Sequence, residues 1–406
     1  MKKIIIVFCI LFSAINASAI KVLLAEGSKE ITISANGRFV VKNLEDEVLF
    51  NAISFSINWI SENRILLNSD TIKNSLKVFP ANSVLFSTNK TGQNRYTGNL
   101  IIRSDSMGLR LIEEIDFEEY LYGVLPYEMS ASWHIEALKV QAVTARTYAA
   151  RNLIAPEGED FDVYSGVMSQ MYKGTGNIFE NKNTYGNVIK AVDETKGQVL
   201  AYNGKMFTTY YHSNCGGHTG PPVWNKIEDE IPPLQGTNCD ACLRAGNFKN
   251  KTWSHTFTSE HIQQFASTLY TDESKQILEK DSLQKNVALK KISGKITNIK
   301  PIEKTVDGRV VLLAIISENG DVATISCQEL RLGIGAGQLK SCNLDIIKKE
   351  NDGSFSFSGR GFGHGVGMCQ IGAKQLAEEK KKYDEILRFY YQGAEIIDYK
   401  KTFLAK

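Results

Sequence analysis

The sequence predicts an α+β protein with a β-rich N-terminal part, residues 20–117, followed by a helix-containing part, residues 118–406. Short runs of alternating apolar and polar residues, separated by turn signals, fill the first part and are typical of antiparallel strands. An apolar pattern at helical spacing then begins near Ile135. The chain has 406 residues, 43% of them hydrophobic, so it is long enough for two domains with their own cores.

Residues 1–19 have the layout of a secretory signal peptide. A basic start precedes an apolar run at Ile4–Phe12, and small residues at 17–19 predict cleavage before Ile20. The apolar run is too short for an ordinary membrane span. We therefore expect an exported protein of the periplasm or cell-wall space, without strong membrane insertion after cleavage. An uncleaved signal that remains as an anchor is the alternative.

The net charge argues against nucleic acid as a partner. The chain carries 47 basic and 45 acidic residues, and removal of Lys2 and Lys3 with the signal leaves the two equal in number. A formally neutral protein has no global attraction for polyphosphates.

The first elements expected after the signal are short strands. Turn signals at 35–37 (Ala-Asn-Gly) and 90–92 (Lys-Thr-Gly) separate some of them. The alternating runs lie at 21–25, 31–34, 39–42, 84–87, 98–103 and 109–115. We expect them to form an antiparallel sheet.

The next element is a long helix that Pro156 ends. Its apolar face is formed by Ile135, Leu138, Ala142, Ala145 and Ala149. The small residues on this face predict close packing against another element. Gln141, Arg146 and Tyr148 are polar groups of the same helix that could point toward a groove, although a solvated helix face is the commoner explanation.

A hairpin is expected next, with strands at 199–202 and 206–210. Asn203-Gly204 between them is the strongest short hairpin turn signal, because both residues tolerate positive φ. The charged segment 252–289 is expected to be largely helical.

Strands and then helices are expected to complete the chain. Strands return at 295–325, with turns at Asp307-Gly308 and Asn319-Gly320. Two helices follow at about 370–380 and 384–391, the second with Asp384 as its cap.

Glu128 is the first candidate for chemistry. It stands among aromatic and apolar residues, namely Tyr122, Leu125, Pro126, Tyr127, Met129 and Trp133. Burial against such side chains disfavours the charged form, so a carboxyl group there can stay protonated near neutrality and act as an acid. The alternative is a solvated glutamate that favours the positive N-terminus of the following helix.

The glycines at 359, 361, 363, 365 and 367 alternate along the chain. Because glycine lacks a β-carbon, this backbone can approach a ligand closely or adopt positive φ. Neither a G-x-G-x-x-G pattern nor a P-loop is present, so we expect no organic cofactor. His364 stands in this stretch, and histidine is the side chain whose ordinary pKa lies near neutrality. Most single histidines are structural, but one held on a glycine-rich tip is expected to face a groove.

Four residues match the spacing of a closed tetrahedral zinc site. Cys215-Gly-Gly-His218 and Cys239-Asp-Ala-Cys242 each place two ligands with two residues between them, which predicts a structural zinc ion. His212 is an alternative fourth ligand. A disulfide, either between Cys239 and Cys242 or from Cys215 to one of them, is the competing interpretation in an exported protein.

Three further cysteines follow a different pattern. Cys327 and Cys342 could close a loop with a disulfide worth about 3 kcal/mol. Cys369 is left over and is expected to pack as a small buried residue.

The usual hydrolase motifs are absent from the sequence. G-x-S-x-G and H-E-x-x-H do not occur. An ordinary glycosidase needs two carboxylates that flank the bond, and motif context supplies only Glu128.

Three stretches together resemble the signature of the stage II sporulation protein D family (SpoIID/LytB domain). They are EYLYGVLPYEMSASWHIEALKVQAVTARTYAARN, YYHSNCGGHT and GRGFGHGVGMCQIGA, in the same order as in the family. The resemblance extends over about residues 22–399. The family is known for peptidoglycan lytic transglycosylases that prefer glycan strands stripped of stem peptides.

The resemblance implies an α+β fold around a long glycan groove, with Glu128 as the catalytic acid/base. It also implies that certain polar residues lie in or near this groove. These are Gln141, Arg146, Gln170, Tyr172, His212, Ser213, His364 and Gln370. Family members bear a zinc ion or a cysteine cluster beside the groove. The sequence departs from the family at Cys369, where serine is common, and at Ile371, where an aromatic residue is usual.

A single carboxyl group suffices for the implied reaction. The acid protonates the glycosidic oxygen between N-acetylmuramic acid and N-acetylglucosamine, and the resulting carboxylate deprotonates the 6-hydroxyl of the same sugar to close a 1,6-anhydro ring. Peptidoglycan glycan strands are therefore the expected partner. The alternatives are a non-catalytic wall-binding module that enhances an N-acetylmuramoyl-L-alanine amidase, and a structural zinc domain of an envelope complex.

Overall fold

The computed structural model describes residues 19–67, 70–73, 75–87, 94–223, 230–246, 252–272 and 290–400. Residues 1–18 of the predicted signal peptide and the expected turn at 90–92 lie outside these residues, whereas Ala19 begins the first strand. Among the helices of the described part, none has both the length and the apolar character that crossing a membrane requires.

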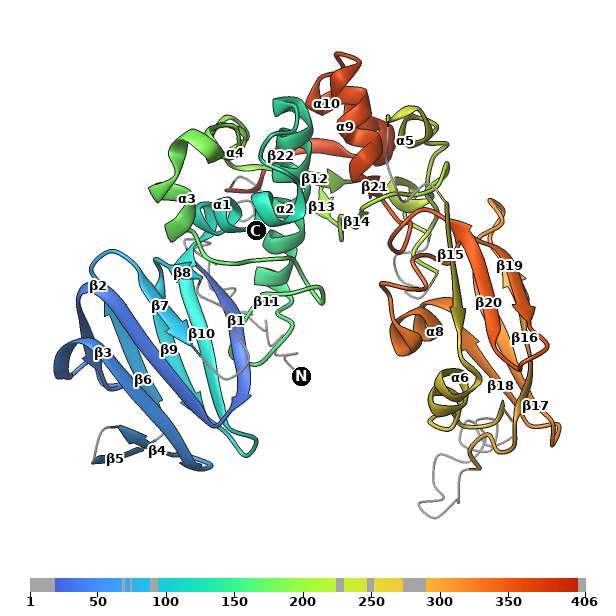
Figure 1. The fold of residues 1–406 in the computed structure, drawn as a ribbon. Coiled ribbons are helices and arrows are strands. Elements are labelled where there is room, and N and C mark those ends of the chain that lie inside the picture. The colour runs from blue at the N-terminus through green and yellow to red at the C-terminus, as the bar shows by residue number, and fades with distance from the viewer. Residues whose placement is uncertain are drawn as a thin grey trace, which may run out of the picture. The chain divides into compact units, whose positions relative to one another are not determined.

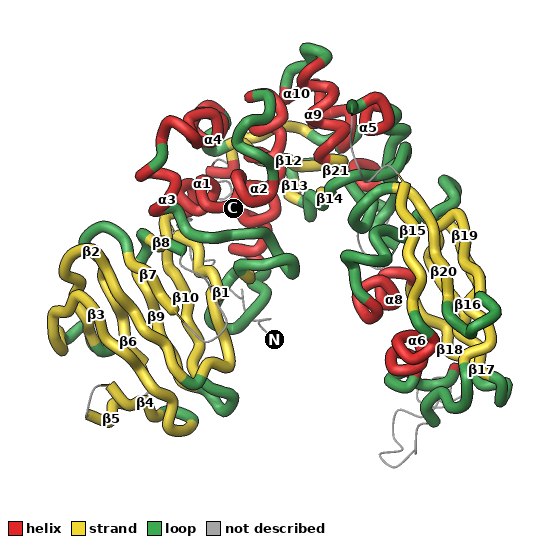
Figure 2. Tube along the Cα trace, viewed as in Figure 1, coloured by secondary structure: helices red, strands yellow, loops and turns green. Residues whose placement is uncertain are grey.

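The chain divides into two compact units (Figure 1). Unit 1 comprises Met1–Thr208 and Glu395–Lys406, and unit 2 comprises Thr209–Ala394. Helices and strands occur in both units, and a large sheet dominates the N-terminal region, so the predicted α+β class is confirmed (Figure 2). The boundary expected between residues 117 and 118 stays a prediction.

Unit 1 contains an eleven-stranded sheet. Its strands are β1 (Ala19–Ser28), β2 (Glu30–Lys42), β3 (Val48–Ser61), β4 (Arg64–Leu67), β5 (Asp70–Lys73), β6 (Ser75–Pro80), β7 (Val84–Ser87), β8 (Arg95–Tyr96), β9 (Asn99–Ser104), β10 (Leu109–Asp116) and β11 (Val163–Tyr164). They follow the order β11-β1-β10-β9-β6-β2-β3-β4-β5, with β7 paired to β2 and β8. The turn expected at 35–37 is instead an irregularity within β2, where the register against β3 shifts between Ser34 and Phe39.

Helices join this sheet to the rest of unit 1. They are α1 (Phe117–Glu128), α2 (Ile135–Ile154), α3 (Gly176–Glu180) and α4 (Lys182–Glu194). α1 begins directly after β10 because the Asp116 carboxylate accepts hydrogen bonds from the Glu118 and Glu119 N–H groups, at 2.9 and 3.1 Å. The predicted long helix is confirmed as α2, whose small residues allow close contact with α1, α4 and β12.

A small sheet completes unit 1. It has the order β13-β12-β22, from β12 (Gln198–Tyr202), β13 (Lys205–Met206) and β22 (Glu395–Asp398). The predicted hairpin is confirmed: Asn203 and Gly204 have φ values of 50° and 73° between the paired strands β12 and β13.

Unit 2 contains two three-stranded sheets, β15-β20-β19 and β16-β17-β18, and the short pair β14-β21. Its strands are β14 (Tyr211–His212), β15 (Thr252–Phe257), β16 (Ile296–Lys304), β17 (Val310–Ser317), β18 (Val322–Ser326), β19 (Leu344–Lys349), β20 (Phe355–Arg360) and β21 (Met368–Cys369). Its helices are η1 (Pro232–Leu234), α5 (Ala241–Arg244), α6 (Ser259–Ala266), α8 (Cys327–Ile334), α9 (Gln370–Glu378) and α10 (Tyr383–Tyr390). The buried core of this unit includes Phe257, Leu313, Leu330 and Phe357.

Two sequence-based expectations for unit 2 were wrong in part. Residues 252–257 form strand β15, because they pair with β20 across about a hundred residues of sequence, and only α6 within 252–272 is helical. The cap of α10 is Lys382, with Asp384 in the first turn.

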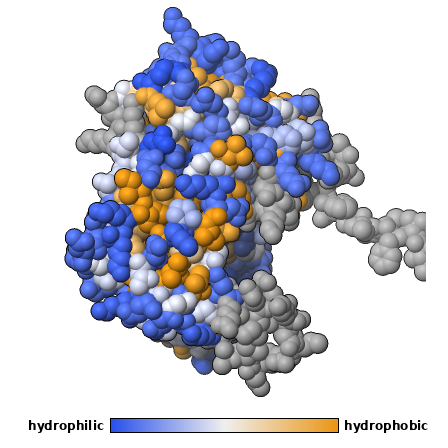
Figure 3. All heavy atoms as spheres, turned by 90° about the vertical axis from the view of Figure 1, so that its right-hand side faces the viewer, coloured by the Kyte–Doolittle hydropathy of each residue, from blue (hydrophilic) through white to orange (hydrophobic). Residues whose placement is uncertain are grey.

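Figure 3 shows apolar side chains that gather on one face of the molecule.

Candidate functional site

Glu128 is the last residue of α1. Pro126 lies in the final turn of this helix, and the backbone becomes extended at Met129, with φ −130° and ψ 144°. No basic residue stands in the last turn, so the negative end of the helix dipole acts on Glu128 and favours a protonated carboxyl group. Glu128 does not cap α2, because the N-cap of that helix is His134.

A backbone N–H group fixes the carboxylate of Glu128. Its Oε1 accepts a hydrogen bond of 2.7 Å from the N–H of Met171, and the side chain is half-buried. This hydrogen bond favours the ionised form, in opposition to the helix dipole. The end of α1 thus favours the protonated form of the Glu128 carboxyl group, and the Met171 N–H favours its ionised form.

The loop that carries Met171 also carries Gln170 and Tyr172. Gln170 accepts a hydrogen bond of 3.2 Å from the Tyr120 hydroxyl, and Tyr120 stacks on Tyr172 with 5.0 Å between ring centroids. Burial raises the pKa of Tyr120 well above its usual value, with further contributions from Tyr148 and Glu128. Gln170 and Tyr172 are therefore buried beside Glu128 within the same unit.

Tyr172 needs a glycine in α1. A β-carbon at Gly123 would lie 2.4 Å from the Tyr172 ring, so only glycine lets the loop cross the helix there. The Tyr172 hydroxyl donates a 2.7 Å hydrogen bond to Glu113, which is fully buried on β10. Burial raises the pKa of Glu113 to about 7, although its hydrogen bonds with Tyr172 and Gly98 act in the opposite direction.

Glu157 supports the same loop from its other end. Its carboxylate accepts hydrogen bonds from Ser169 and from the Tyr148 hydroxyl, the latter at 2.9 Å. Ser169 Oγ in turn accepts a 2.8 Å hydrogen bond from the Tyr164 N–H. These contacts hold the loop close to the position from which Met171 reaches Glu128.

Arg146 on α2 is fully buried and bonded to protein groups. Its Nε and Nη2 donate to the Glu118 carboxylate at 2.9–3.1 Å, and its Nη atoms also reach Thr195, Val192 and Gln198 at 3.2–3.3 Å. The geometry gives Arg146 a role in holding α1, α2 and the start of β12 together. Gln141, on the same helix, is also fully buried.

In unit 2 the glycine-rich stretch runs beside the segment 210–220. β14 and β21 pair in parallel, with Tyr211 opposite Met368. Gly361, Gly363, Gly365 and Gly367 all have positive φ, from 66° to 111°. At Gly367 a β-carbon would lie 2.0 Å from the Tyr210 carbonyl oxygen, so glycine is required for this approach.

His212 and His364 lie against each other, with 5.4 Å between ring centroids. His212 Nδ1 donates to the Val366 carbonyl at 3.0 Å, and His364 Nδ1 accepts from the Val366 N–H at 3.1 Å while its Nε2 donates to Tyr211 at 2.9 Å. His364 is therefore neutral, with its proton on Nε2, and His212 carries a proton on Nδ1. Burial lowers the pKa of His212 well below its usual value and that of His364 to about 4.

Ser213 and Gln370 lie next to this pair in the chain. Ser213 follows β14, and its carbonyl accepts a 3.1 Å hydrogen bond from the Ile371 N–H. Gln370 is the first residue of α9 and is buried.

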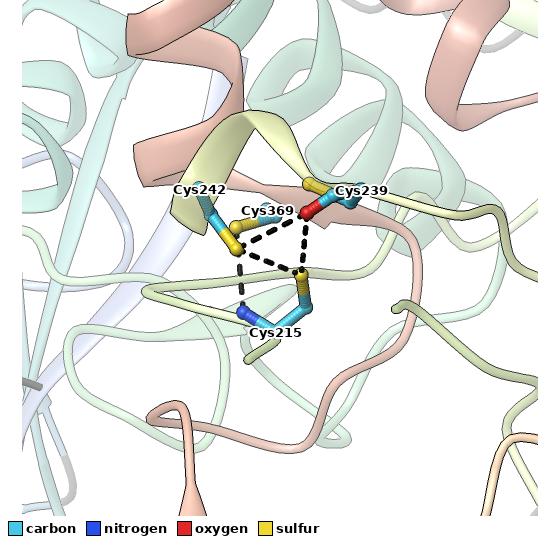
Figure 4. Close-up of side chains that lie close together, drawn as sticks. All are labelled: Cys215, Cys239, Cys242 and Cys369. Carbon is cyan, nitrogen blue, oxygen red and sulfur yellow. Dashed lines mark hydrogen bonds between the residues drawn. The ribbon is translucent and has the colours of Figure 1, made fainter. Parts of the chain in front are cut away.

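Four cysteine thiols form a buried cluster in unit 2 (Figure 4). The sulfur atoms of Cys215, Cys239, Cys242 and Cys369 all lie within 4.8 Å of one another, and Cys215 and Cys242 are 3.4 Å apart. A tetrahedral zinc ion with four thiolates needs sulfur atoms separated by about 3.8 Å. Hydrogen bonds with Cys215 and Cys239 lower the pKa of Cys242. The donor set therefore fits a closed, structural zinc site.

The expected fourth ligand, His218, lies outside this cluster. His218 is 42% exposed, and its Nδ1 lies 3.6 Å from the Asp307 carboxylate. Two glycines of positive φ, Gly216 and Gly217, separate it from Cys215 and direct it elsewhere. Cys369 is the fourth residue of the cluster. Its sulfur accepts hydrogen bonds from the N–H groups of Cys215 and Gly372, at 3.3 and 3.4 Å.

All six cysteines of the described residues are free thiols. Cys327 and Cys342 lie within hydrogen-bond reach of each other in the core of unit 2.

Sequence reasoning missed several buried charged residues, among them Glu113 and Arg309. Glu113 interrupts the inward-facing positions 109, 111 and 115 of β10, and this alternation is a signal that could have found it. Arg309 follows the Asp307-Gly308 turn, and no sequence signal marks it as buried.

Comparison with known proteins places two regions in described families. Residues 105–202 match the stage II sporulation protein family, and residues 231–367 match a domain of unknown function (DUF8618). An uncharacterized protein of Brachyspira hyodysenteriae is 31% identical over 97% of this chain and 96% of its own length. Stage II sporulation protein D of Bacillus subtilis is 30% identical, over 70% of this chain and 75% of that protein.

A third relative carries a different name. The amidase enhancer of Bacillus subtilis is 31% identical over 82% of this chain, and the match spans 48% of that protein.

Proposed function

This chain belongs to the stage II sporulation protein D family, and on that premise we propose that it is an exported peptidoglycan lytic transglycosylase with Glu128 as its single acid/base. Its substrate is the bond between N-acetylmuramic acid and N-acetylglucosamine in glycan strands without stem peptides. The observation that carries the proposal is the half-buried Glu128 carboxylate between the end of α1 and the Met171 N–H.

The two opposing influences on Glu128 suit a group that must act twice. As the acid, the carboxyl group protonates the glycosidic oxygen while an oxocarbenium-like state develops, and the helix end favours the protonated form that this step needs. The carboxylate then takes the proton of the 6-hydroxyl as the 1,6-anhydro ring closes, and the Met171 N–H supports that ionised form. Since the attacking hydroxyl belongs to the substrate, no second carboxylate is needed to activate water.

The partners of Glu128 support an ordered site. Tyr120, Gln170 and Tyr172 form a buried hydrogen-bonded and stacked group beneath the loop, and Glu157 supports the far end of that loop. In unit 2, the Cys215, Cys239, Cys242 and Cys369 cluster would hold a structural zinc ion and fix the segment after His212. Such an ion has no open position, so its role is architectural.

The test is Glu128→Gln, with purified protein, peptide-free glycan and no amidase. We expect the release of 1,6-anhydromuramoyl products, followed by mass spectrometry, to fall by about a hundred- to ten-thousandfold, because positioned proton transfer contributes this much. Glycan binding should persist. Glu159→Gln, at an exposed carboxylate of the same unit, is the matched control and should keep full turnover. Retained turnover in Glu128→Gln rejects the assignment.

A second candidate function rests on the similarity to the amidase enhancer. In that case the chain binds glycan and accelerates a partner N-acetylmuramoyl-L-alanine amidase without cleaving sugar bonds. Binding assays cannot separate the two functions, whereas product analysis can. Faster amidase turnover, with no anhydro product from the purified chain alone and no effect of Glu128→Gln, would favour this second function.

A further inference from the structure

Arg309 is a buried cation that the proposed reaction does not use. It follows the Asp307-Gly308 turn between β16 and β17, and its side chain is only 7% exposed. A β-carbon at Gly365 would lie 2.3 Å from Arg309 Cζ. The guanidinium group therefore lies directly on the glycine-rich loop, in a space that glycine leaves open.

The protein satisfies this guanidinium only in part. Nη2 donates to the carbonyl oxygens of Cys215 and His218, at 3.4 and 2.9 Å. Nε is buried and has no hydrogen-bond partner among the described residues, and the Asp307 carboxylate approaches it only to 3.8 Å. A buried cation whose N–H groups are not all paired destabilises the fold. An anionic ligand that binds here would therefore explain why an arginine occupies this position.

A second buried arginine adds positive charge to the same region. Arg331 on α8 is 7% exposed and donates through Nε to the Lys340 carbonyl at 3.1 Å. Burial is the largest cause that lowers the pKa of His364 to about 4, and the positive charges of Arg331 and Arg309 lower it further. The hydrogen bond to the Tyr211 carbonyl acts in the opposite direction. His364 is thus neutral, and Asp307 is the one carboxylate in ion-pair contact with Arg309 among the described residues.

A small cavity opens beside Arg309. Its volume is about 70 Å³, and its lining includes Arg309, His364, Gln328, Val310 and Leu312. A single water needs about 10–15 Å³ by this measure, so the cavity has room for a carboxylate with a small alkyl group and none for a peptide. Pro221, Val223 and Val311 also line a neighbouring cavity of about 740 Å³, which is large enough for sugar rings.

We propose that Arg309 binds the free lactyl carboxylate that muramic acid exposes once its stem peptide has been removed. This inference rests on the proposed function, because it assumes a glycan strand as the ligand. The lactyl group combines one carboxylate with one methyl group, which matches a guanidinium beside apolar walls. A stem peptide would turn the carboxylate into a neutral amide and attach a chain that the cavity cannot hold.

The test compares three ligands for binding to the protein that carries Glu128→Gln, so that no turnover occurs. They are peptide-free glycan strands, the same strands with their carboxylates converted to methylamides, and chitin oligosaccharides, which lack the lactyl group. We expect the carboxylate strands to bind about 10- to 100-fold more tightly than the methylamides, as for a charged hydrogen bond. Arg309→Gln should reduce this preference to less than about threefold.

Two further variants keep the test decisive. Arg309→Lys should retain part of the preference, and Arg388→Gln, at an arginine that is 64% exposed on α10, should retain all of it. Equal binding of both strand types by the parent protein overturns the proposal without any variant, as does an undiminished preference in Arg309→Gln. If the carboxylate strands bind more tightly but the protein with Glu128 intact releases no anhydro products, only the proposed cleavage reaction is overturned. If anhydro products appear but the carboxylate strands do not bind more tightly, only the proposed role of Arg309 is overturned.

Discussion

Each unit buries an arginine, and the two differ in how the protein satisfies them. Arg146 in unit 1 is fully buried, and its guanidinium donates to the Glu118 carboxylate and to three further protein groups. Arg309 in unit 2 has two carbonyl contacts and a buried Nε without a hydrogen-bond partner among the described residues.

On our proposal, the difference separates a structural charge, Arg146, from one that binds a ligand, Arg309. In unit 1, Arg146 is paired with the Glu118 carboxylate and Glu113 with the Tyr172 hydroxyl. In unit 2 the buried polar groups, four thiols and a partly paired guanidinium, have the arrangement of sites that take up a metal ion or an anion. Both arginines are buried, Arg146 at 0% and Arg309 at 6% exposure, so burial alone does not distinguish them.

Among the variants that test the contrast between the two arginines, we expect Glu118→Gln to change the stability most. It leaves the Arg146 charge buried without its counter-ion, so the free energy of unfolding should fall by about 3–5 kcal/mol. Urea denaturation followed by circular dichroism measures this loss. Glu180→Gln is the control, because its pair with Arg95 at 3.3 Å is exposed and should matter by less than about 1 kcal/mol. A small loss in Glu118→Gln would show that Arg146 does not depend on the pair.

Glu113 should give the next largest effect, and it depends on pH. Because its pKa in the folded protein is raised from 4.5 to about 7, the protonated form stabilises the fold fully below pH 4.5, and this stabilisation is lost as the pH rises to 7. Relative to wild type, Glu113→Gln should therefore gain about 3 kcal/mol of stability between pH 4.5 and pH 8.

Denaturation curves across this pH range, with Glu114→Gln on the opposite face of β10 as the control, measure the change. A stability difference between Glu113→Gln and wild type that does not vary with pH would contradict the raised pKa.

The thiol cluster allows a test of which residues of unit 2 bind a metal ion. We expect Cys369→Ser to lose bound zinc, because it removes one of four converging sulfur ligands, and His218→Ala to keep it. Zinc content by atomic emission, together with the melting temperature before and after chelation, tests this. The opposite result would restore His218 as the fourth ligand.

Arg309→Gln should have the smallest effect on stability. Its removal breaks two hydrogen bonds to carbonyl groups and a loose ion pair of 3.8 Å with Asp307, so we expect a loss of about 1–2 kcal/mol in the absence of glycan. The same denaturation assay applies. A loss as large as that of Glu118→Gln would mean that Arg309 is structural, and the contrast between the two arginines would disappear.

Local patterns accounted for the elements that the sequence predicted well. The spacing of Ile135, Leu138 and Ala142 marked α2, and Asn203-Gly204 marked the hairpin, because helix periodicity and turn conformation depend on near neighbours. Strand β15 escaped prediction because its partner β20 lies about a hundred residues away.

The same limit applies to the sites. Cys215, Cys239 and Cys242 were identified from their spacing, but Cys369 reaches them from 154 residues beyond Cys215, and no local pattern announces that contact. Glu128 was selected for its apolar neighbours, yet the Met171 N–H that fixes its carboxylate comes from a loop 43 residues later. His218, predicted from ligand spacing, lies outside the thiol cluster, because spacing ignores the positive φ of Gly216 and Gly217.

The pairing of β22 with β12 has a consequence for how the molecule is made. Leu200 pairs with Ile396, so the small sheet of unit 1 includes residues on both sides of unit 2 in the chain. A ribosome delivers the N-terminal end first, so it releases all of unit 2 before this sheet can close. Maturation of the unit that holds Glu128 therefore waits until β22 has emerged.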